Sequence, residues 1–270
     1  MQLSELGELG LLEELERRGL AERIENDAAE LDGGRIVTQD ALVEGVHFRL
    51  DWISWRDLGY RAAAVNISDL SASGATPDGL IVSLGLPRET ELADVVELYE
   101  GIGESAVPVL GGDTTAADRV YLSVTALGRS DRVPGRAGAR PGDLIVVTGP
   151  LGGAGAAFRE QRYIRPPIRT DEGRELARRA HAMLDISDGL EQDLTHLASR
   201  SGVHCIVELE RVALADGAAI EDLGFGEDYE LLAAMPSEAF YVIGRCEAGE
   251  GVELLRYGVP VALGGWEHFS

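Results

Sequence analysis

Four aspartates in this chain each follow a short apolar run, and together they could form an acidic metal site. They are Asp40, Asp69, Asp113 and Asp185. We expect each of them where a strand or helix ends, and ligand crevices of α/β folds lie at such ends. Converging carboxylates repel one another unless cations lie between them, and hard oxygen ligands select Mg²⁺. One aspartate alone could simply cap a helix or begin a turn, but the set of four favours a metal site.

Three glycine-containing segments could bring backbone amides close to phosphate oxygens. They are residues 111–115, 149–155 and 187–189. The second is expected to open a helix, and the N-terminus of a helix favours anions. Each segment alone is also typical of an ordinary turn. Residues 226–230 are rich in acidic side chains, and in a chain of this charge such a stretch is typical of a solvated surface.

The charge balance limits what this chain could bind and how. Its formal net charge is −23, which argues against nucleic acid and against anionic membrane surfaces as partners. All 24 residues counted as Lys or Arg are arginine. The absence of lysine excludes a Walker A lysine, a Schiff-base lysine and a kinase-type strand lysine. Arginine, backbone amides and metal ions would have to handle any phosphate group.

Length and composition describe a globular chain with a substantial core. Its 270 residues are 45% apolar, enough for one large domain or two ordinary ones. Cys205 and Cys246 are too few for a disulfide framework, so we expect buried free thiols. No apolar run is long enough for a membrane span, and the first residues lack the features of a secretory signal. We therefore expect a cytoplasmic location.

Hydrophobic periodicity predicts helices and strands that alternate along the chain. Helices are expected over residues 6–20, 57–65, 92–105, 152–158, 171–182 and 188–201. Strands are expected over residues 36–38, 80–86, 107–110, 121–127, 144–148, 182–186 and 203–209. This order predicts an α+β fold with α/β-type interleaving. The segment 129–142 is rich in Gly, Pro and Arg, so we place a domain boundary there, between domains 1–135 and 136–270.

Seven motifs, taken in their order along the chain, resemble those of the thiamine-monophosphate kinase family. They are residues 39–48, 65–70, 111–115, 138–143, 185–190, 226–231 and 264–269. That family shares a superfamily with aminoimidazole ribonucleotide synthetase, selenophosphate synthetase and a hydrogenase maturation protein. The resemblance implies a two-domain fold like that of aminoimidazole ribonucleotide synthetase, with the sheets of the N-terminal domains paired in a homodimer. The N-terminal domain would bind ATP and metal, and the C-terminal domain would complete the nucleotide and substrate site.

The resemblance also implies an activity and its residues. ATP would phosphorylate thiamine monophosphate to thiamine diphosphate with several Mg²⁺ ions. The implied metal positions are Asp27, Thr38, Asp40, Asp69, Asp113, Asp185 and Asp188, with Asp113 and Asp188 also catalytic. The implied ATP contacts are Tyr99, Gly112, Asp113, Arg136 and Ser187, and the implied thiamine-phosphate contacts are His47, Glu227 and Trp266.

The chain departs from the family pattern at several positions. Glu25-Asn26-Asp27 stands where the family has Gly-Asp-Asp, and Gln39 replaces a usual threonine. The segments 158–170 and 211–225 look shorter than the family's, so loops that enclose the substrate could differ.

Other interpretations stay open at this stage. His47 could merely pack at a strand end. Trp266 could fill a core, or its indole could stack on the rings of thiamine. The alternative functions are another ATP-dependent phosphotransferase or synthetase of the same superfamily, and an inactive Mg-ATP-binding dimer module.

Overall fold

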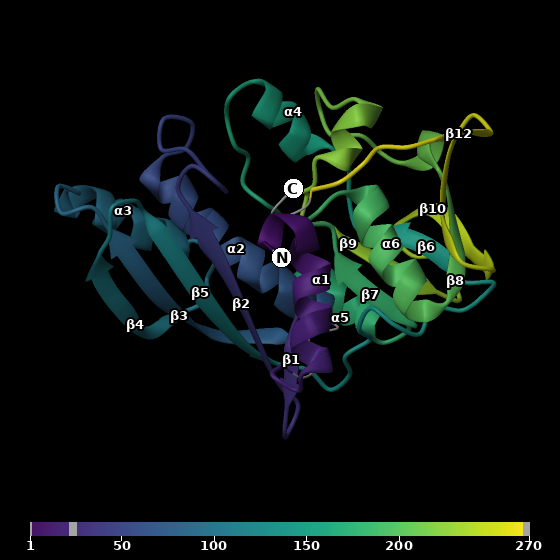
Figure 1. Cartoon of the computed structure of the whole chain (residues 1–270), viewed down its shortest axis with the longest axis horizontal. Coiled ribbons are helices and arrows are strands. Elements are labelled where there is room, and N and C mark those ends of the chain that lie inside the picture. Colours follow the sequence, from purple (N-terminus) through teal and green to yellow (C-terminus); the bar gives the residue numbers. More distant parts are fainter. Residues whose placement is uncertain (1, 22–25, 267–270) are drawn as a thin grey trace.

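The chain folds into two β-sheets with helices packed against them and between them (Figure 1). The structure is a computed structural model, and it describes residues 2–21 and 26–266. The first sheet is mixed, with the order β1-β2-β5-β3-β4, and the second has the order β12-β11-β8-β10-β6-β9-β7. The first five strands are β1 (Ala29–Leu31), β2 (Arg35–Val43), β3 (Thr76–Leu86), β4 (Val109–Ala116) and β5 (Tyr121–Arg129). The others are β6 (Leu144–Val147), β7 (Ala182–Asp185), β8 (Val203–Glu208), β9 (Leu231–Met235), β10 (Tyr241–Ala248), β11 (Gly251–Arg256) and β12 (Val259–Val261).

One face of the first sheet is covered by helix α2 (Trp55–Ala72), which is largely buried and contacts elements of both sheets. The helix begins where the Ser54 hydroxyl accepts a hydrogen bond from the backbone N–H of Asp57. Alternate side chains of β2, including Ile36, Thr38 and Leu42, are buried on the covered face. The opposite face of this sheet and the edge strand β4 are much more exposed.

The second sheet has its own core. Helix α6 (Leu190–Ser201) presents Leu190, Leu194 and Leu197 at helical spacing, and these side chains are buried against the sheet. Helices α4 (Gly153–Arg159) and α5 (Thr170–Ala177) and the short 3₁₀ helices η1 (Leu209–Arg211) and η2 (Ile220–Gly224) complete this part. Cys205 and Cys246 are buried free thiols, as expected, with their Sγ atoms 3.9 Å apart.

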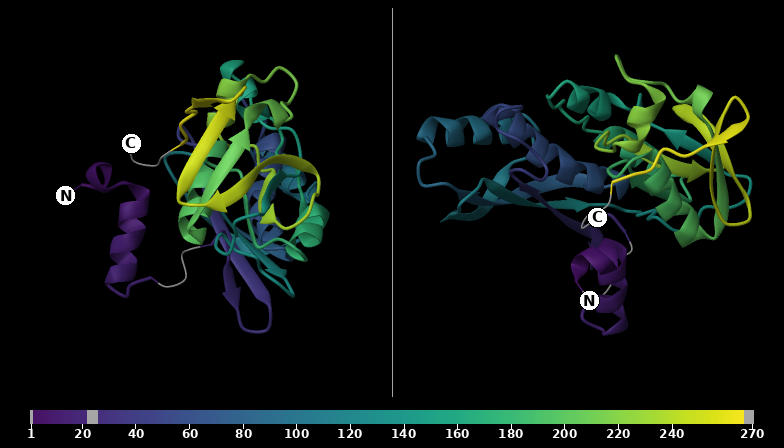
Figure 2. Two further views of the ribbon diagram at one scale, coloured as in Figure 1. Left: turned by 90° about the vertical axis from the view of Figure 1, so that its right-hand side faces the viewer. Right: turned by 45° about the horizontal axis from the view of Figure 1, so that its top comes forward.

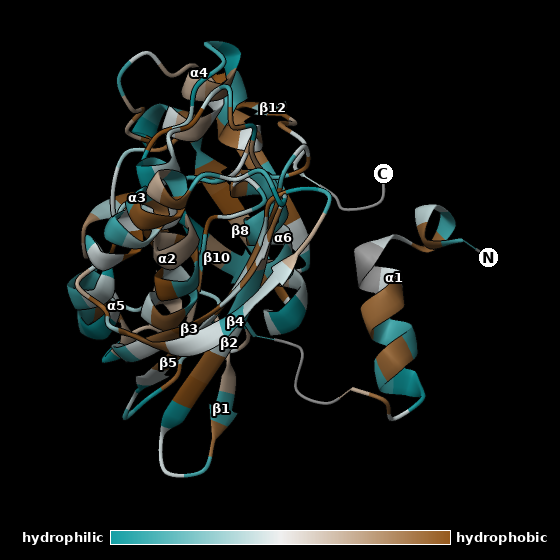
Figure 3. Ribbon diagram, turned by 90° about the vertical axis from the view of Figure 1, so that its left-hand side faces the viewer, coloured by the Kyte–Doolittle hydropathy of each residue, from teal (hydrophilic) through white to brown (hydrophobic). Residues whose placement is uncertain are grey.

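Helix α1 (Leu3–Arg17) stands away from the rest of the chain (Figure 2). It lies on the side of the first sheet opposite to α2 and α3 (Leu92–Gly103), and it carries both hydrophobic and hydrophilic residues (Figure 3). None of its described side chains is buried. No helix within the described ranges is long and apolar enough to cross a membrane.

The predicted helices and strands occur in the predicted order, and the mixed fold is confirmed, but several boundaries were wrong and β1, β9, β10, β11 and β12 were not predicted. Two of the four aspartates do not lie where a strand or helix ends: Asp40 and Asp113 are inside β2 and β4. The prediction is confirmed for Asp69, in the last turn of α2, and for Asp185, which ends β7. The strands and α2 are longer because pairing across the sheet and packing extend them past the apolar runs. The boundary at residue 135/136 stays a prediction.

Close contact between α2 and α3 depends on glycine. A Cβ atom added at Gly101 would lie 1.9 Å from the carbonyl oxygen of Arg56, whereas a Cβ added at Gly103, in the same helix, would meet nothing within 4 Å. We expect Gly101→Ala to lower the free energy of unfolding by about 2–3 kcal/mol, because the helices must move apart. Gly103→Ala should stay within roughly 0.5 kcal/mol of wild type. Urea unfolding of both variants tests this; equal stability of the two would contradict the helix contact.

Candidate active site

Three carboxylates from distant parts of the sequence meet between the two sheets. They belong to Asp27 before β1, Asp69 in α2 and Asp185 at the end of β7, and one oxygen atom from each lies within 4.8 Å of the others. Asp185 is 3% exposed and the side chain of Asp27 is also 3% exposed. A group of acids this close and this dry is a candidate metal centre.

Asp40 and Asp188 extend the group electrostatically. Burial, with the charges of Asp27 and Asp188, raises the pKa of Asp40 to about 6. Burial and the charge of Asp27 raise the pKa of Asp185 to about 8, although the Ser68 hydroxyl opposes the shift. Burial and neighbouring aspartates also raise the pKa of Asp69. We call these five residues, Asp27, Asp40, Asp69, Asp185 and Asp188, the acidic cluster.

Neighbouring hydroxyl and amide groups hold the acidic cluster in place. The Ser68 hydroxyl donates to Asp185 Oδ2 at 2.5 Å. The Thr38 hydroxyl lies 2.5 Å from Asp69 Oδ2 and 3.0 Å from the Asp27 carbonyl oxygen. The backbone N–H of Asp40 donates to Oδ1 of Asn66 at 2.9 Å. The two hydroxyl groups orient the carboxylates of Asp69 and Asp185, and Asn66 fixes the backbone of Asp40; all three partners are uncharged.

Arg136 supplies a positive charge to this group. Its Nη2 lies 2.5 Å from Asp27 Oδ1, and its Nε donates to the same oxygen at 2.8 Å. Its backbone N–H donates to the Asn26 side-chain oxygen at 2.9 Å. The side chain of Asn26 therefore fixes the backbone at Arg136. Glu25 lies outside the described residues.

The donor set fits Mg²⁺. Each of the five aspartates in the acidic cluster offers carboxylate oxygen, the ligand type that Mg²⁺ prefers. Burial and the neighbouring carboxylates, which raise the pKa values of Asp40 and Asp185, both disfavour the ionised forms, and a bound cation would favour them. Gln39 does not join this set, because its Oε1 accepts from the Thr125 hydroxyl at 2.9 Å.

A second loop lies directly against the Asp185–Asp188 segment. The backbone N–H of Glu227 donates to the Ser187 carbonyl at 2.9 Å, and that of Tyr229 donates to the Ile186 carbonyl at 2.9 Å. Glu227 and Tyr229 both have left-handed backbone angles, φ of 60° and 52°. Non-glycine residues in this conformation are strained and often occur at functional sites.

Asp228 and Glu230 of this loop are buried and Glu227 is only partly exposed, so the expectation of a solvated surface was wrong. The carboxylate of Asp228 accepts the backbone N–H of Gly152 at 2.8 Å, at the start of α4. Burial raises the pKa of Asp228 to about 6. Arg169 binds both oxygens of Glu230. In the glycine-rich turn before α4, the backbone amide of Gly152 therefore binds the Asp228 carboxylate, at a place where the sequence suggested a phosphate. Tertiary packing brings Asp228 there.

Glu227 also pairs with a residue that the sequence analysis missed. Its Oε1 accepts a hydrogen bond from Nη2 of Arg61, a buried arginine of α2. The Arg61 guanidinium lies over the ring of Tyr163, which contacts Trp52. Trp52 in turn meets Phe158 edge to face, with the ring centres 5.4 Å apart. Arg61 could have been noticed in the sequence, because it is an arginine within an apolar run.

His47 and Trp266 lie near the ends of their segments. Nδ1 of His47 accepts the backbone N–H of Val43 at 3.1 Å, so a neutral His47 would carry its proton on Nε2. The backbone N–H of Trp266 donates to the Asp188 carbonyl at 2.9 Å, which ties the last described residue to the acidic cluster. Its side chain is 47% exposed, so Trp266 does not fill a core.

The structure does not bring Tyr99, Gly112 and Asp113 to the acidic cluster of the same chain. Asp113 aligns with Ala41 across β3 and β5, one residue from Asp40, so its side chain faces the opposite side of the sheet. A Cβ at Gly112 would lie 1.8 Å from the Val82 carbonyl oxygen, so glycine is required there for strand contact. Tyr99 is partly buried against the core beneath α3.

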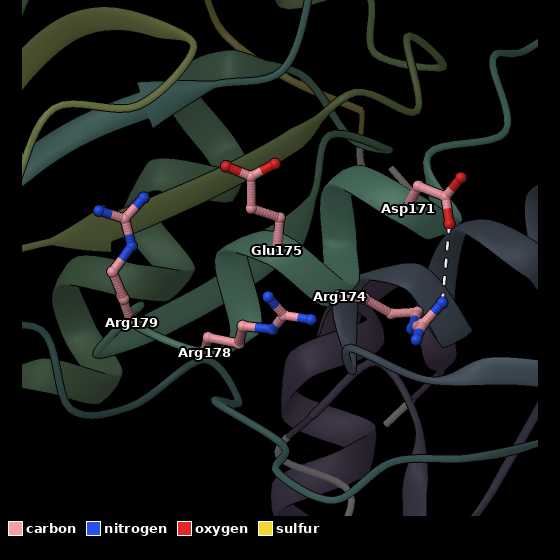
Figure 4. Close-up of a pocket in the computed structure, with 5 residues that line it drawn as sticks. All are labelled: Asp171, Arg174, Glu175, Arg178 and Arg179. Carbon is pink, nitrogen blue, oxygen red and sulfur yellow. Dashed lines mark ion pairs between the residues drawn. The ribbon is translucent and has the colours of Figure 1, made fainter.

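A separate open cavity of about 580 Å³ lies on α5 and the residues that follow it (Figure 4). It is lined by Asp171, Arg174, Glu175, Arg178 and Arg179. It contains none of the predicted site residues. Its side chains belong to consecutive turns of one segment, whereas the acidic cluster joins several distant segments.

Comparison with known proteins gives consistent matches. The family model for the N-terminal domain of AIR synthase related proteins matches residues 25–130. Thiamine-monophosphate kinase of Aquifex aeolicus is 34% identical over 309 aligned positions that span both chains completely. The enzyme of Pyrococcus abyssi is 32% identical over 87% of this chain and 86% of its own.

Solved structures give the same result. The structure of AaThiL complexed with AMPPCP and TMP superimposes with a TM-score of 0.91 at 34% identity and covers 99% of both chains. A hydrogenase maturation protein HypE, at 20% identity and a TM-score of 0.73 over 94% of this chain and 97% of its own, shares the fold. The sequence identity over the full length and the structural match together show that the chain belongs to the thiamine-monophosphate kinase family.

Proposed function

We propose that this chain transfers the terminal phosphoryl group of ATP to thiamine monophosphate, giving thiamine diphosphate and ADP. An oxygen of the acceptor phosphate forms a bond to the γ-phosphorus, and the bond from that phosphorus to the oxygen of the leaving ADP breaks. The observation that carries the proposal is the acidic cluster, in a chain whose full-length relatives are named as this kinase. The acceptor phosphate is already a competent nucleophile, so alignment and charge neutralisation are the main requirements.

Five aspartates, with Thr38, would hold several Mg²⁺ ions. The aspartates are Asp27, Asp40, Asp69, Asp185 and Asp188. When bound, Mg²⁺ would neutralise the phosphates of both substrates and let these anions approach each other. The hydroxyl of Ser68 keeps the Asp185 carboxylate in position, and the side-chain oxygen of Asn66 fixes the backbone of Asp40. Asp188 would act beside the reacting phosphates as a catalytic residue.

The remaining site residues divide between the two substrates. Arg136 would exchange part of its pairing with Asp27 for an ATP phosphate, because a cation bound to Asp27 would replace the charge that Arg136 provides. Ser187 would contact ATP from the loop that precedes α6. His47, Glu227 and Trp266 would recognise thiamine monophosphate, with the Trp266 indole against its rings.

Asp113, Gly112 and Tyr99 would act on the site of a second copy. Support for this comes from the exposed face of the first sheet, which carries Asp113, and from the exposed edge strand β4. Two such faces packed together in a homodimer would bury the apolar and small side chains there, and facing sheets lie about 10 Å apart. Because β4 is an edge strand, Asp113 would reach the acidic cluster around the edge of its partner's sheet, as a metal ligand and catalytic residue.

A turnover assay tests the activity directly. Purified protein is incubated with ATP, excess Mg²⁺ and thiamine monophosphate, and thiamine diphosphate is measured by chromatography. Formation of thiamine diphosphate with equal ADP supports the proposal. ADP release with another acceptor only, or no turnover despite Mg-ATP binding, would contradict it.

The role of Asp113 in a dimer can be separated from a role in its own chain. We expect Asp113→Asn and Asp185→Asn each to lower kcat by at least about 100-fold, since each removes a ligand charge. Mixing the two inactive variants after dissociation should restore about one quarter of wild-type activity, because half of the dimers are hybrids with one intact site. No recovery on mixing, with dimers formed normally, would place Asp113 in its own chain's site or outside the chemistry.

Trp266 offers a test of acceptor recognition. We expect Trp266→Ala to raise KM for thiamine monophosphate about 5- to 150-fold, from a loss of roughly 1–3 kcal/mol of stacking and burial, with little change in KM for ATP. Trp266→Phe, which keeps an aromatic face, should recover most of the affinity. An unchanged KM together with a lower thermal midpoint would mean that Trp266 has a structural role only.

A further inference from the structure

Arg61 is an arginine buried where the two halves of the chain meet. Its side chain is 2% exposed, and it extends from α2 within the apolar run that packs the first core. A charge buried in this way requires a partner of opposite sign. The partner is Glu227, which is 166 positions away in the sequence and belongs to the loop beside Ser187.

The Glu227 carboxylate uses only one of its oxygens in this pair. Oε1 accepts from Nη2 of Arg61, and among the described residues Oε2 receives no hydrogen bond. The side chain is 21% exposed, so this second oxygen is available to a ligand from the open side. The left-handed backbone of Glu227, with φ of 60°, is held by its N–H bond to Ser187.

The rest of the Arg61 guanidinium is not optimised for stability. Its Nε is buried without a hydrogen-bond partner in the described structure. Its central carbon lies 5.2 Å from the ring centre of Tyr163, which gives only a cation–π contact on that side. A buried charge with an unsatisfied donor costs free energy of folding. Arg61 is therefore better explained by the position that it gives Glu227 than by a contribution to stability.

Helix α2 connects this pair to the acidic cluster. Arg61 and Asp69 are eight residues apart on the same helix, about 12 Å along its axis. Glu227 is therefore held at two points: its side chain by Arg61, on the helix that also carries Asp69, and its backbone by Ser187, next to Asp188.

We infer that Arg61 is a positioning residue for acceptor recognition. It fixes the Glu227 carboxylate with one oxygen turned toward the ring end of the acceptor, where an amino group or the cationic ring can meet it. The inference rests on the proposed function. It assigns Arg61 no contact with ATP and no part in the bond changes.

The test compares Arg61→Met with Arg56→Met, a matched change in the same helix at an exposed arginine paired with Glu100 and Glu104. Steady-state kinetics should show KM for thiamine monophosphate raised about tenfold or more in Arg61→Met, with KM for ATP within about twofold of wild type. Arg56→Met should match wild type in both. Arg61→Lys, which keeps the charge but not the planar fork, should give an intermediate KM.

A double-mutant cycle distinguishes positioning from general stabilisation. If Arg61 acts through Glu227, then adding Arg61→Met to Glu227→Gln should raise KM for thiamine monophosphate no further. Additive effects, or equal increases in both KM values, would overturn the inference. If Arg61→Met does not fold, a wild-type KM in Arg61→Lys would overturn it as well. Failure of the proposed function is recognised separately, because wild type itself would then form no thiamine diphosphate.

Discussion

Several carboxylates held together away from water need positive charge, and the arrangement of this protein follows from that need. The acidic cluster draws Asp27 from the start of the first sheet, Asp69 from α2 and Asp185 from the second sheet. These elements pack against one another, so folding brings the charges together. The protein itself offers Arg136, whose guanidinium pairs with Asp27. The remaining negative charge must be met by protons or by metal ions.

The chain contains no lysine, and arginine carries out the fixed pairings around the site. Arg169 binds Glu230, Arg136 binds Asp27 and Arg61 binds Glu227. Arginine keeps its charge when buried and offers a planar set of donors, which suits carboxylates that must be held at one orientation. These three pairs link the first sheet, the second sheet and the segment around α5. The same contacts that assemble the halves therefore define the positions of the groups that would meet the substrates.

The sequence predicted the type and order of most elements because apolar periodicity is local. It also identified Asp40, Asp69 and Asp185 as neighbours, since carboxylates after apolar runs tend to meet in a crevice. It could not predict the face on which Asp113 lies, because that depends on the register of β4 on β3. Nor could it show that Asp228 caps α4 or that Arg61 reaches Glu227, because both contacts join residues more than 70 positions apart.

The folded chain holds the acidic cluster short of positive charge until metal ions bind. This can be measured as the thermal midpoint of metal-free protein from pH 5 to pH 8, with and without Mg²⁺. Folded-state pKa values of about 6 for Asp40 and about 8 for Asp185 exceed the ordinary value of 3.8, so the folded state binds more protons than the unfolded state in this range. Stability should therefore fall as pH rises, by an amount on the order of 5 °C in midpoint.

Mg²⁺ replaces those protons, so it should raise the midpoint much more at pH 8 than at pH 5. Asp185→Asn removes one of the titrating groups and should flatten the metal-free profile. A midpoint that is constant from pH 5 to pH 8 without metal, with the same small effect of Mg²⁺ at both ends, would contradict the account.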